Sequence, residues 1–224
     1  MKKGDFIWGG FLLLIIALLV LSKTKVLFLE ATAAHPYCMG FFKFALLASM
    51  GELLAIRITT GVYTKPIGLL YKAFVWGFIG VVIVIIFRIF SVGVHGLLDT
   101  GLLPFKNSTL SFAFFTSLLM NTTFAPTMMA FHRVTDTIID NKYIKKTSKI
   151  SHILEKIDWN AFIKFVIFKT IPFFWIPAHT ITFLLPSEYR VLMAAFLSIA
   201  LGAILAFAKK KGEKNYLKRE SLTK

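Results

Sequence analysis

Cysteine is nearly absent from this sequence, and the motifs of common catalytic sites are missing. Cys38 is the single cysteine, which excludes an internal disulfide and a cysteine-rich metal site. The five histidines show neither HxxxH nor HExxH spacing, so the sequence predicts no bound metal. Nucleophile-elbow, Walker and dinucleotide-binding glycine motifs are also missing. We therefore expect neither an enzyme nor a cofactor.

Charge is the other scarce feature. Only 17% of the 224 residues are charged and 57% are hydrophobic, whereas in soluble domains about a quarter of the residues are charged. A helix needs about 20 mainly apolar residues to cross the hydrocarbon core of a bilayer. Apolar runs recur along the whole chain and predict an all-α integral membrane protein, a bundle of about six transmembrane helices. The six segments are Phe6–Leu21, Tyr37–Arg57, Ile67–Val92, Leu110–Phe131, Asn160–Leu185 and Tyr189–Ala208.

The basic residues, which give a net charge of +15, are unevenly distributed. Most fall on one side of the six segments, above all between Arg133 and Lys156 and in the tail from Lys209 onward. This asymmetry predicts that both termini are cytoplasmic. It also indicates contact of the basic loop and tail with anionic lipids rather than with nucleic acid. The lack of an Arg/Ser-rich leader favours a multi-pass protein of a cell membrane, of the bacterial inner-membrane type.

The chain is expected to have three parts. Residues 1–33 form an N-terminal span with its connector, residues 34–209 form the helical bundle, and residues 210–224 form a basic cytoplasmic tail. The first apolar segment also resembles a signal peptide, although the cleavage-like residues Ala31–Ala33 lie about ten residues beyond the apolar run, farther than usual. A retained span is the preferred interpretation.

Two charged residues are predicted to lie deep in the membrane. Glu52 shares a helical face with small residues, which indicates that it points into the bundle. Lys169 lies in the fifth segment at a depth that a lysine stem could bridge to Glu52. The sequence therefore predicts a Glu52–Lys169 pair, either a structural ion pair or part of a water-filled path. Lys43, Arg57, Lys72 and Arg88 lie nearer segment ends and are expected to reach the interface.

The fourth and fifth segments carry polar residues and prolines. In the fourth, Asn121 and Thr123 lie near mid-membrane and Pro126 predicts a kink. The fifth segment is interrupted by prolines, and Pro172 and Pro177 leave backbone carbonyls without helical partners. The helical face whose residues recur every three or four positions is therefore expected to turn inward, away from lipid. A histidine on this face is more often a packed residue than a ligand. The face consists of Lys169, Pro172, Trp175, His179 and Thr182.

The sixth segment and its surroundings indicate packing rather than chemistry. The turn at Pro186 makes a hairpin of the fifth and sixth segments. Small residues at every fourth position of the sixth segment predict a helix interface, namely Ala194, Ser198, Gly202 and Ala206. Asp136 and Asp140 lie four residues apart in a lysine-rich stretch, where local ion pairing is the simplest interpretation.

The end of the fifth segment resembles a family signature. Trp175, Pro177, Pro186, Tyr189 and Arg190 are similar to the C-terminal motif of the Mpv-seventeen/peroxisomal membrane protein family, and collinear likenesses extend over about residues 34–209. The resemblance implies a small helical bundle, for which passage of ions or small metabolites has been proposed. It implies no catalytic residue. The family's Asp-Gln pair in its third helix is replaced here by Met120-Asn121.

These features support two main hypotheses of function. The first is a channel or permease-like path for small solutes or ions, lined by Glu52, Asn121, Thr123, Lys169, His179 and Thr182. The second is a non-conducting membrane interaction or assembly protein in which buried polar residues only fix the helix packing. A lipid enzyme would need a cluster of acids or histidines at one interface, and the sequence alone shows none. Homo-oligomerisation is an open alternative in every case.

Overall fold

The computed structural model describes residues 2–143 and 149–222, and within these ranges all regular structure is helical. The expected all-α class is therefore confirmed. Among the described residues, five helical stretches are long and apolar enough to cross a membrane, namely Lys3–Val20, Pro36–Thr60, Leu69–Asp99, Trp159–Leu184 and Ser187–Ile204. The helices are α1 (Lys3–Val20), α2 (Ser22–Ala34), α3 (Pro36–Thr60), α4 (Leu69–Asp99), α5 (Thr109–Thr123), α6 (Ala125–Tyr143), α7 (Ile150–Glu155), α8 (Trp159–Ala161), the π-helix η1 (Phe162–Trp175), α9 (Ile176–Leu184) and α10 (Ser187–Leu222).

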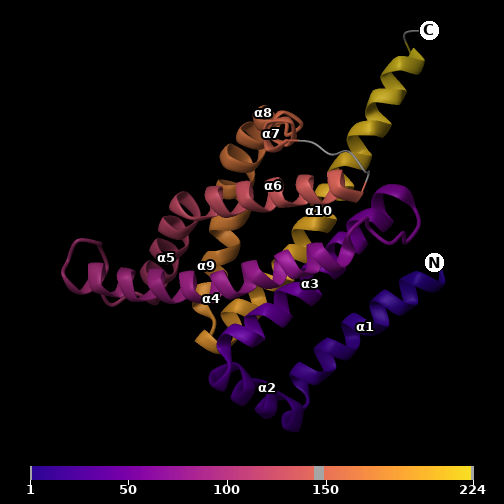
Figure 1. Ribbon diagram of the computed structural model, residues 1–224. Coiled ribbons are helices and arrows are strands. Elements are labelled where there is room, and N and C mark those ends of the chain that lie inside the picture. The colour runs from indigo at the N-terminus through magenta and orange to yellow at the C-terminus, as the bar shows by residue number, and fades with distance from the viewer. Residues whose placement is uncertain (1, 144–148, 223–224) are drawn as a thin grey trace.

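The predicted fourth span is not one continuous helix. It divides at Phe124 into α5, which has 15 residues, and α6, which leaves at an angle and runs beside α4 (Figure 1). Pro126 lies in the first turn of α6, where its missing N–H is tolerated. The hydroxyl of Thr123 donates to the carbonyl of Leu119 at 2.6 Å, a local bond that often bends helices. The segment from Leu110 to Phe131 therefore supplies no candidate span.

Local sequence explains several helix ends. Pro36 occupies the first turn of α3, and the helix ends at Gly61, whose φ of 78° lies in the left-handed region that glycine adopts without strain. At the start of α5, the Ser108 hydroxyl accepts a hydrogen bond from the amide of Ser111 at 3.2 Å. The basic loop expected between Arg133 and Lys156 is largely helical where it is described.

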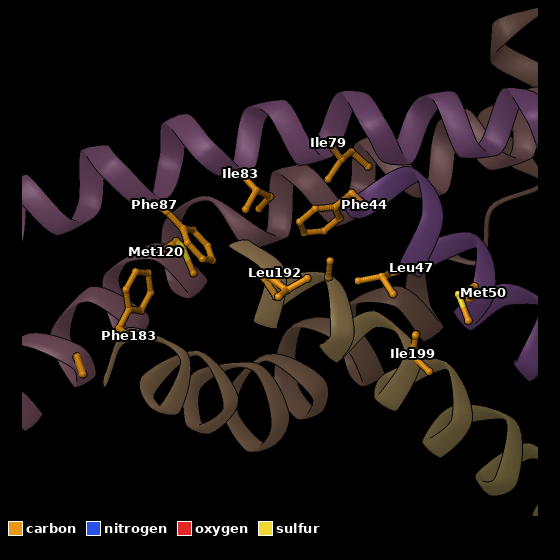
Figure 2. Packing of buried hydrophobic residues seen from close by; sticks show 13 residues of the cluster. Phe44, Leu47, Met50, Ile79, Ile83, Phe87, Met120, Phe183, Leu192 and Ile199 are labelled. Atoms are coloured by element: carbon orange, nitrogen blue, oxygen red, sulfur yellow. The ribbon is translucent and has the colours of Figure 1, made fainter. Parts of the chain in front are cut away.

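The core lies between α3, α4 and α10, and α5 and α9 close one end of it. Figure 2 shows Phe44 and Leu47 of α3 facing Ile79 and Ile83 of α4, with Leu192 from α10 nearby. The first helix runs beside α3, where the indole nitrogen of its Trp8 donates to the carbonyl of Met50 at 3.0 Å.

Glycines allow the central helices to approach closely. A Cβ built at Gly40 of α3 would lie 2.9 Å from the carbonyl oxygen of Gly80 in α4. On the other side of α3, a Cβ at Gly202 of α10 would lie 3.1 Å from the carbonyl oxygen of Gly51. The small-residue face of α10 thus lies against α3. On this face, Ala194 and Ala206 are buried, and Ser198 donates to the Ala195 carbonyl at 2.6 Å.

Candidate functional site

Among the described residues, three polar regions are candidates for a functional site, and the first is a charged cluster on α3, α4 and α6. The ammonium of Lys72 lies 3.1 Å from Glu52 Oε1 and 3.2 Å from Asp140 Oδ1. Lys72 is almost fully buried, because the helix start that carries it is covered by α3 and α6. One lysine therefore bridges two acids from different helices. We call Glu52, Lys72, His132, Asp136 and Asp140 the charged cluster.

The histidine of the charged cluster has unusual surroundings. His132 Nε2 lies 3.8 Å from Asp136 Oδ1, and both atoms are buried without a hydrogen-bond partner among the described residues. The His132 ring packs 4.1 Å, centroid to centroid, from that of Trp76. Burial lowers the pKa of His132 to about 4. The charge of Glu52 acts to raise this pKa, and the charge of Lys72 acts to lower it further. Burial also raises the pKa of Asp136, so neither group favours its charged form.

A pH dependence of stability follows from His132. Its folded-state pKa lies below the ordinary value of 6.5, so the unfolded chain binds more protons between these values and stability falls as the pH drops from about 6.5 to 4. The raised pKa of Asp136 acts in the opposite direction. Glu52, Lys72 and Arg133 also act on the imidazole.

We expect the wild-type protein to lose about 1–3 kcal/mol relative to a His132→Gln variant over this interval. Thermal unfolding in detergent at pH 4.0, 5.0, 6.0 and 7.0 measures the difference in stability between the two proteins. The effect of the other titrating groups, such as Asp136, is present in both proteins and largely cancels in this difference. A difference that is constant with pH would contradict the prediction.

The second region is a polar contact between α5 and α9. The side-chain amide of Asn121 lies within 3.1–3.2 Å of His179 Nδ1. The Ser117 hydroxyl donates to the carbonyl of Ile176 at 2.7 Å. The Trp175 ring stacks on His179 at a centroid distance of 5.1 Å. These side chains are buried, and Asn121 is inaccessible to solvent, so this region fixes how α9 packs on α5.

A π-helix precedes this contact and changes the predicted face. In a π-helix the amide at position i bonds to the carbonyl at i−5, as the Ile176 amide does with the Ile171 carbonyl. Pro172 therefore deprives the carbonyl of Ile167 of its partner, whereas a regular α-helix would leave the carbonyl of Phe168 unpaired. The longer turn also shifts the phase of the helix. Trp175, His179 and Thr182 are buried as expected, whereas Lys169 and Pro172 are exposed.

The third region is a cavity of about 600 Å³ at the end of the bundle where α3 and α10 begin. The floor includes the buried ring of Phe87, while Tyr37 and Ser187 at the rim are exposed. Basic side chains from three helices line it, namely Lys43 of α3, Arg88 of α4 and Arg190 of α10. The one acidic lining residue is Glu188.

Several sequence predictions for the site need correction. The Glu52–Lys169 pair is not formed, because Lys72 takes the position beside Glu52. Lys169 lies instead beside a small apolar pocket at the surface. Thr123 is exposed and bonds its own helix. None of the six residues expected along one path lines the cavity of about 600 Å³. Asn121 and His179 contact each other, whereas Lys169 and Thr123 are exposed and Glu52 belongs to the charged cluster.

The other predicted residues have structural positions. Tyr189 packs against the apolar core, and the Arg190 Nε donates to the Leu185 carbonyl at 2.9 Å, closing the turn at Pro186. Pro177 lies in the first turn of α9 and is exposed. The basic loop falls partly on residues 144–148, which lie outside the described residues. The tail belongs to α10 as far as Leu222, but its side chains beyond Lys210 also lie outside the description.

Sequence reasoning missed the burial and the partners of charged side chains on α3, α4 and α6. Lys43 and Lys72 lie near segment ends, which suggested solvated head groups, yet both are buried. Asp136 and Asp140 suggested local pairing, yet Asp140 binds Lys72 across helices. The available signal was the pattern His132, Asp136, Asp140, whose four-residue spacing places three titratable groups on one helical face.

A comparison with family models, curated proteins and solved structures found no match for this chain.

Proposed function

We propose that this chain is a permease-like membrane protein that passes small solutes across the bilayer and that is closed in the conformation described above. The observation that carries the proposal is the cavity of about 600 Å³, which reaches from exposed helix ends to Phe87 in the core. Such a volume suits a small ligand. The cavity enters the bundle from one end and stops at packed aromatic rings, as a path closed by side chains would.

The closure lies at Phe87 and Phe183. Their ring centroids are 4.9 Å apart, and Figure 2 shows the two rings side by side next to Met120. Behind them, His179 meets the edge of the Phe87 ring at 5.8 Å. A solute that moved past Phe87 would thus approach the Asn121–His179 contact.

The charged cluster marks the opposite entrance in this proposal. It lies near the end of α3 and the start of α4, whereas the cavity lies near the start of α3. Ile79, Ile83 and Leu47 fill the space between the two regions. The distribution of basic residues would make the charged cluster cytoplasmic and the cavity external. This orientation agrees with a multi-pass protein of a bacterial inner membrane. A solute path also agrees with the resemblance to a family whose members have been proposed as pores.

An osmotic swelling assay tests the proposal. Purified protein is reconstituted in liposomes, and swelling is followed by light scattering with glycerol, potassium succinate or choline chloride outside. We expect at least one solute to enter faster than in protein-free liposomes. Phe87→Ala, which removes the proposed closure, should increase that rate at least threefold.

Phe78→Ala provides the matched control, since Phe78 lies on the same helix and is exposed to the surroundings. Its rate should equal that of the wild-type protein. If neither the wild-type protein nor Phe87→Ala admits any of the three solutes, the permease proposal is wrong.

The second candidate is a non-conducting membrane assembly protein. One observation favours it, namely that Thr116, Ser117, Asn121 and Thr182 are completely buried and satisfied by bonds within the bundle. Such side chains fix helix packing without water. Absence of solute entry in every variant, together with a protein partner that co-purifies in a fixed ratio, would establish this candidate instead.

A further inference from the structure

The lining of the cavity is predominantly basic, and we propose that the cavity binds a small organic anion through a carboxylate or phosphate group. Lys43, Arg88 and Arg190 reach it from three different helices, against the single acid Glu188. In the part of the chain that the structure describes, none of the three basic groups lies within 4.0 Å of a carboxylate. Their charge is therefore available to a ligand.

Lys43 is the strongest indication of an anion. Its side chain is buried, with 6% of the residue exposed, about two turns into the candidate span α3. The ammonium donates to the Thr32 hydroxyl at 3.0 Å and lies 4.4 Å from the centroid of the Phe28 ring. These are neutral partners, and a buried cation without a counter-charge is unfavourable. An anion in the adjoining cavity would supply the missing charge.

The two arginines supply the geometry. Arg190 is held by its Nε bond to the Leu185 carbonyl and by the rings of Phe112 and Phe183, at 5.5 and 5.6 Å from its Cζ. Within the described residues, its terminal nitrogens make no further hydrogen bond, so they can bind a ligand. Arg88 is exposed on the α4 wall of the cavity. Guanidinium groups match carboxylate and phosphate oxygens in a bidentate arrangement.

The remaining lining narrows the class of ligand. Ser91 and Ser187 offer hydroxyls near the basic groups, while Val84 and Phe87 form an apolar wall. A ligand with one anionic group and a short apolar body would satisfy both. Two sources share this chemistry, namely a water-soluble organic acid or phosphate compound and the head group of an anionic lipid. Passage of the anion across the membrane rests on the proposed function, whereas its binding does not.

A thermal-shift assay on the full-length protein tests the binding. The protein is purified in a neutral detergent, and potassium succinate, inorganic phosphate and choline chloride at equal ionic strength serve as probes. We expect succinate or phosphate, but not choline chloride, to raise the unfolding midpoint in a saturable manner. Lys43→Met and Arg88→Gln should each weaken the apparent affinity at least tenfold.

Two controls separate loss of charge from loss of fold. Lys43→Arg keeps the charge and should retain at least a third of the affinity, and Lys164→Gln removes an exposed lysine outside the cavity lining and should change nothing. Lipid is tested in nanodiscs of phosphatidylcholine with or without phosphatidylglycerol. Stabilisation by phosphatidylglycerol that Arg88→Gln abolishes, without an effect of succinate or phosphate, assigns the site to a lipid head group.

The outcomes distinguish this inference from the proposed function. If succinate, phosphate and phosphatidylglycerol all fail to bind, the anion site is wrong even where glycerol still enters liposomes. The same holds if Lys43→Met and Arg88→Gln bind these anions as the wild-type protein does. If anions bind with the expected variant pattern but no solute crosses the bilayer, the site stands and the permease proposal fails.

Discussion

Replacement of Lys72 with methionine is expected to lower the free energy of unfolding by about 3 kcal/mol. The ammonium lies 3.1 Å from Glu52 and 3.2 Å from Asp140, so its removal leaves two carboxylates without their cation. The side chain of Glu52 is 23% exposed, and water therefore replaces the lost interaction only in part. Methionine keeps the apolar stem of the lysine, so the cost reflects the charge rather than a cavity.

The measurement is thermal or detergent-induced unfolding of the purified variant, compared with Lys164→Met at an exposed position. The double variant Glu52→Gln/Lys72→Met should recover at least half of the loss, since it removes the more buried of the two uncompensated carboxylates. An unchanged midpoint for Lys72→Met, or a double variant less stable than Lys72→Met alone, would show that the bridge does not hold α3, α4 and α6 together.

Much of this fold could be predicted because hydrophobic length is a direct physical requirement of the bilayer. Segments such as Tyr37–Arg57 and Ile67–Val92 correspond to α3 and α4 within a few residues at most ends. The fourth segment was different. Its composition is apolar over a full span, but composition does not register that Pro126 and the hydroxyls before it divide the segment into α5 and α6.

The candidate site was less predictable because its groups meet through tertiary packing. Small neighbours in the sequence indicated that Glu52 points inward, but they carried no information about which cation would reach it. The placement of Lys169 on the inward face assumed a regular α-helical phase in the fifth span, and the π-helix η1 changes that phase. Lys43 and Lys72 were expected to reach water from segment ends. Burial of a lysine depends on the helices that cover it, and no local pattern encodes them.

The close approach of α3 and α4 leads to the second large prediction, that Gly80→Leu destabilises the bundle by at least about 3 kcal/mol. A Cβ at Gly80 would collide with the carbonyl of Gly40 and lie 2.8 Å from the Cβ of Phe44. Neither atom is the end of a flexible side chain, so the two helices must separate. Separation would loosen the apolar layer around Phe44 and Ile79, and with it the packing that supports the charged cluster.

Gly93 provides an internal control on the same helix, because a Cβ there meets nothing within 4 Å. Both substitutions gain about 1 kcal/mol of helix propensity when glycine is replaced, so the difference between the two variants isolates the steric cost at the α3–α4 contact. Unfolding of both variants in the same detergent measures it. Gly93→Leu should be neutral or slightly stabilising. Equal stability of the two variants would mean that α3 and α4 do not pack through Gly40 and Gly80, and the cavity between α3, α4 and α10 would then lack its supporting wall.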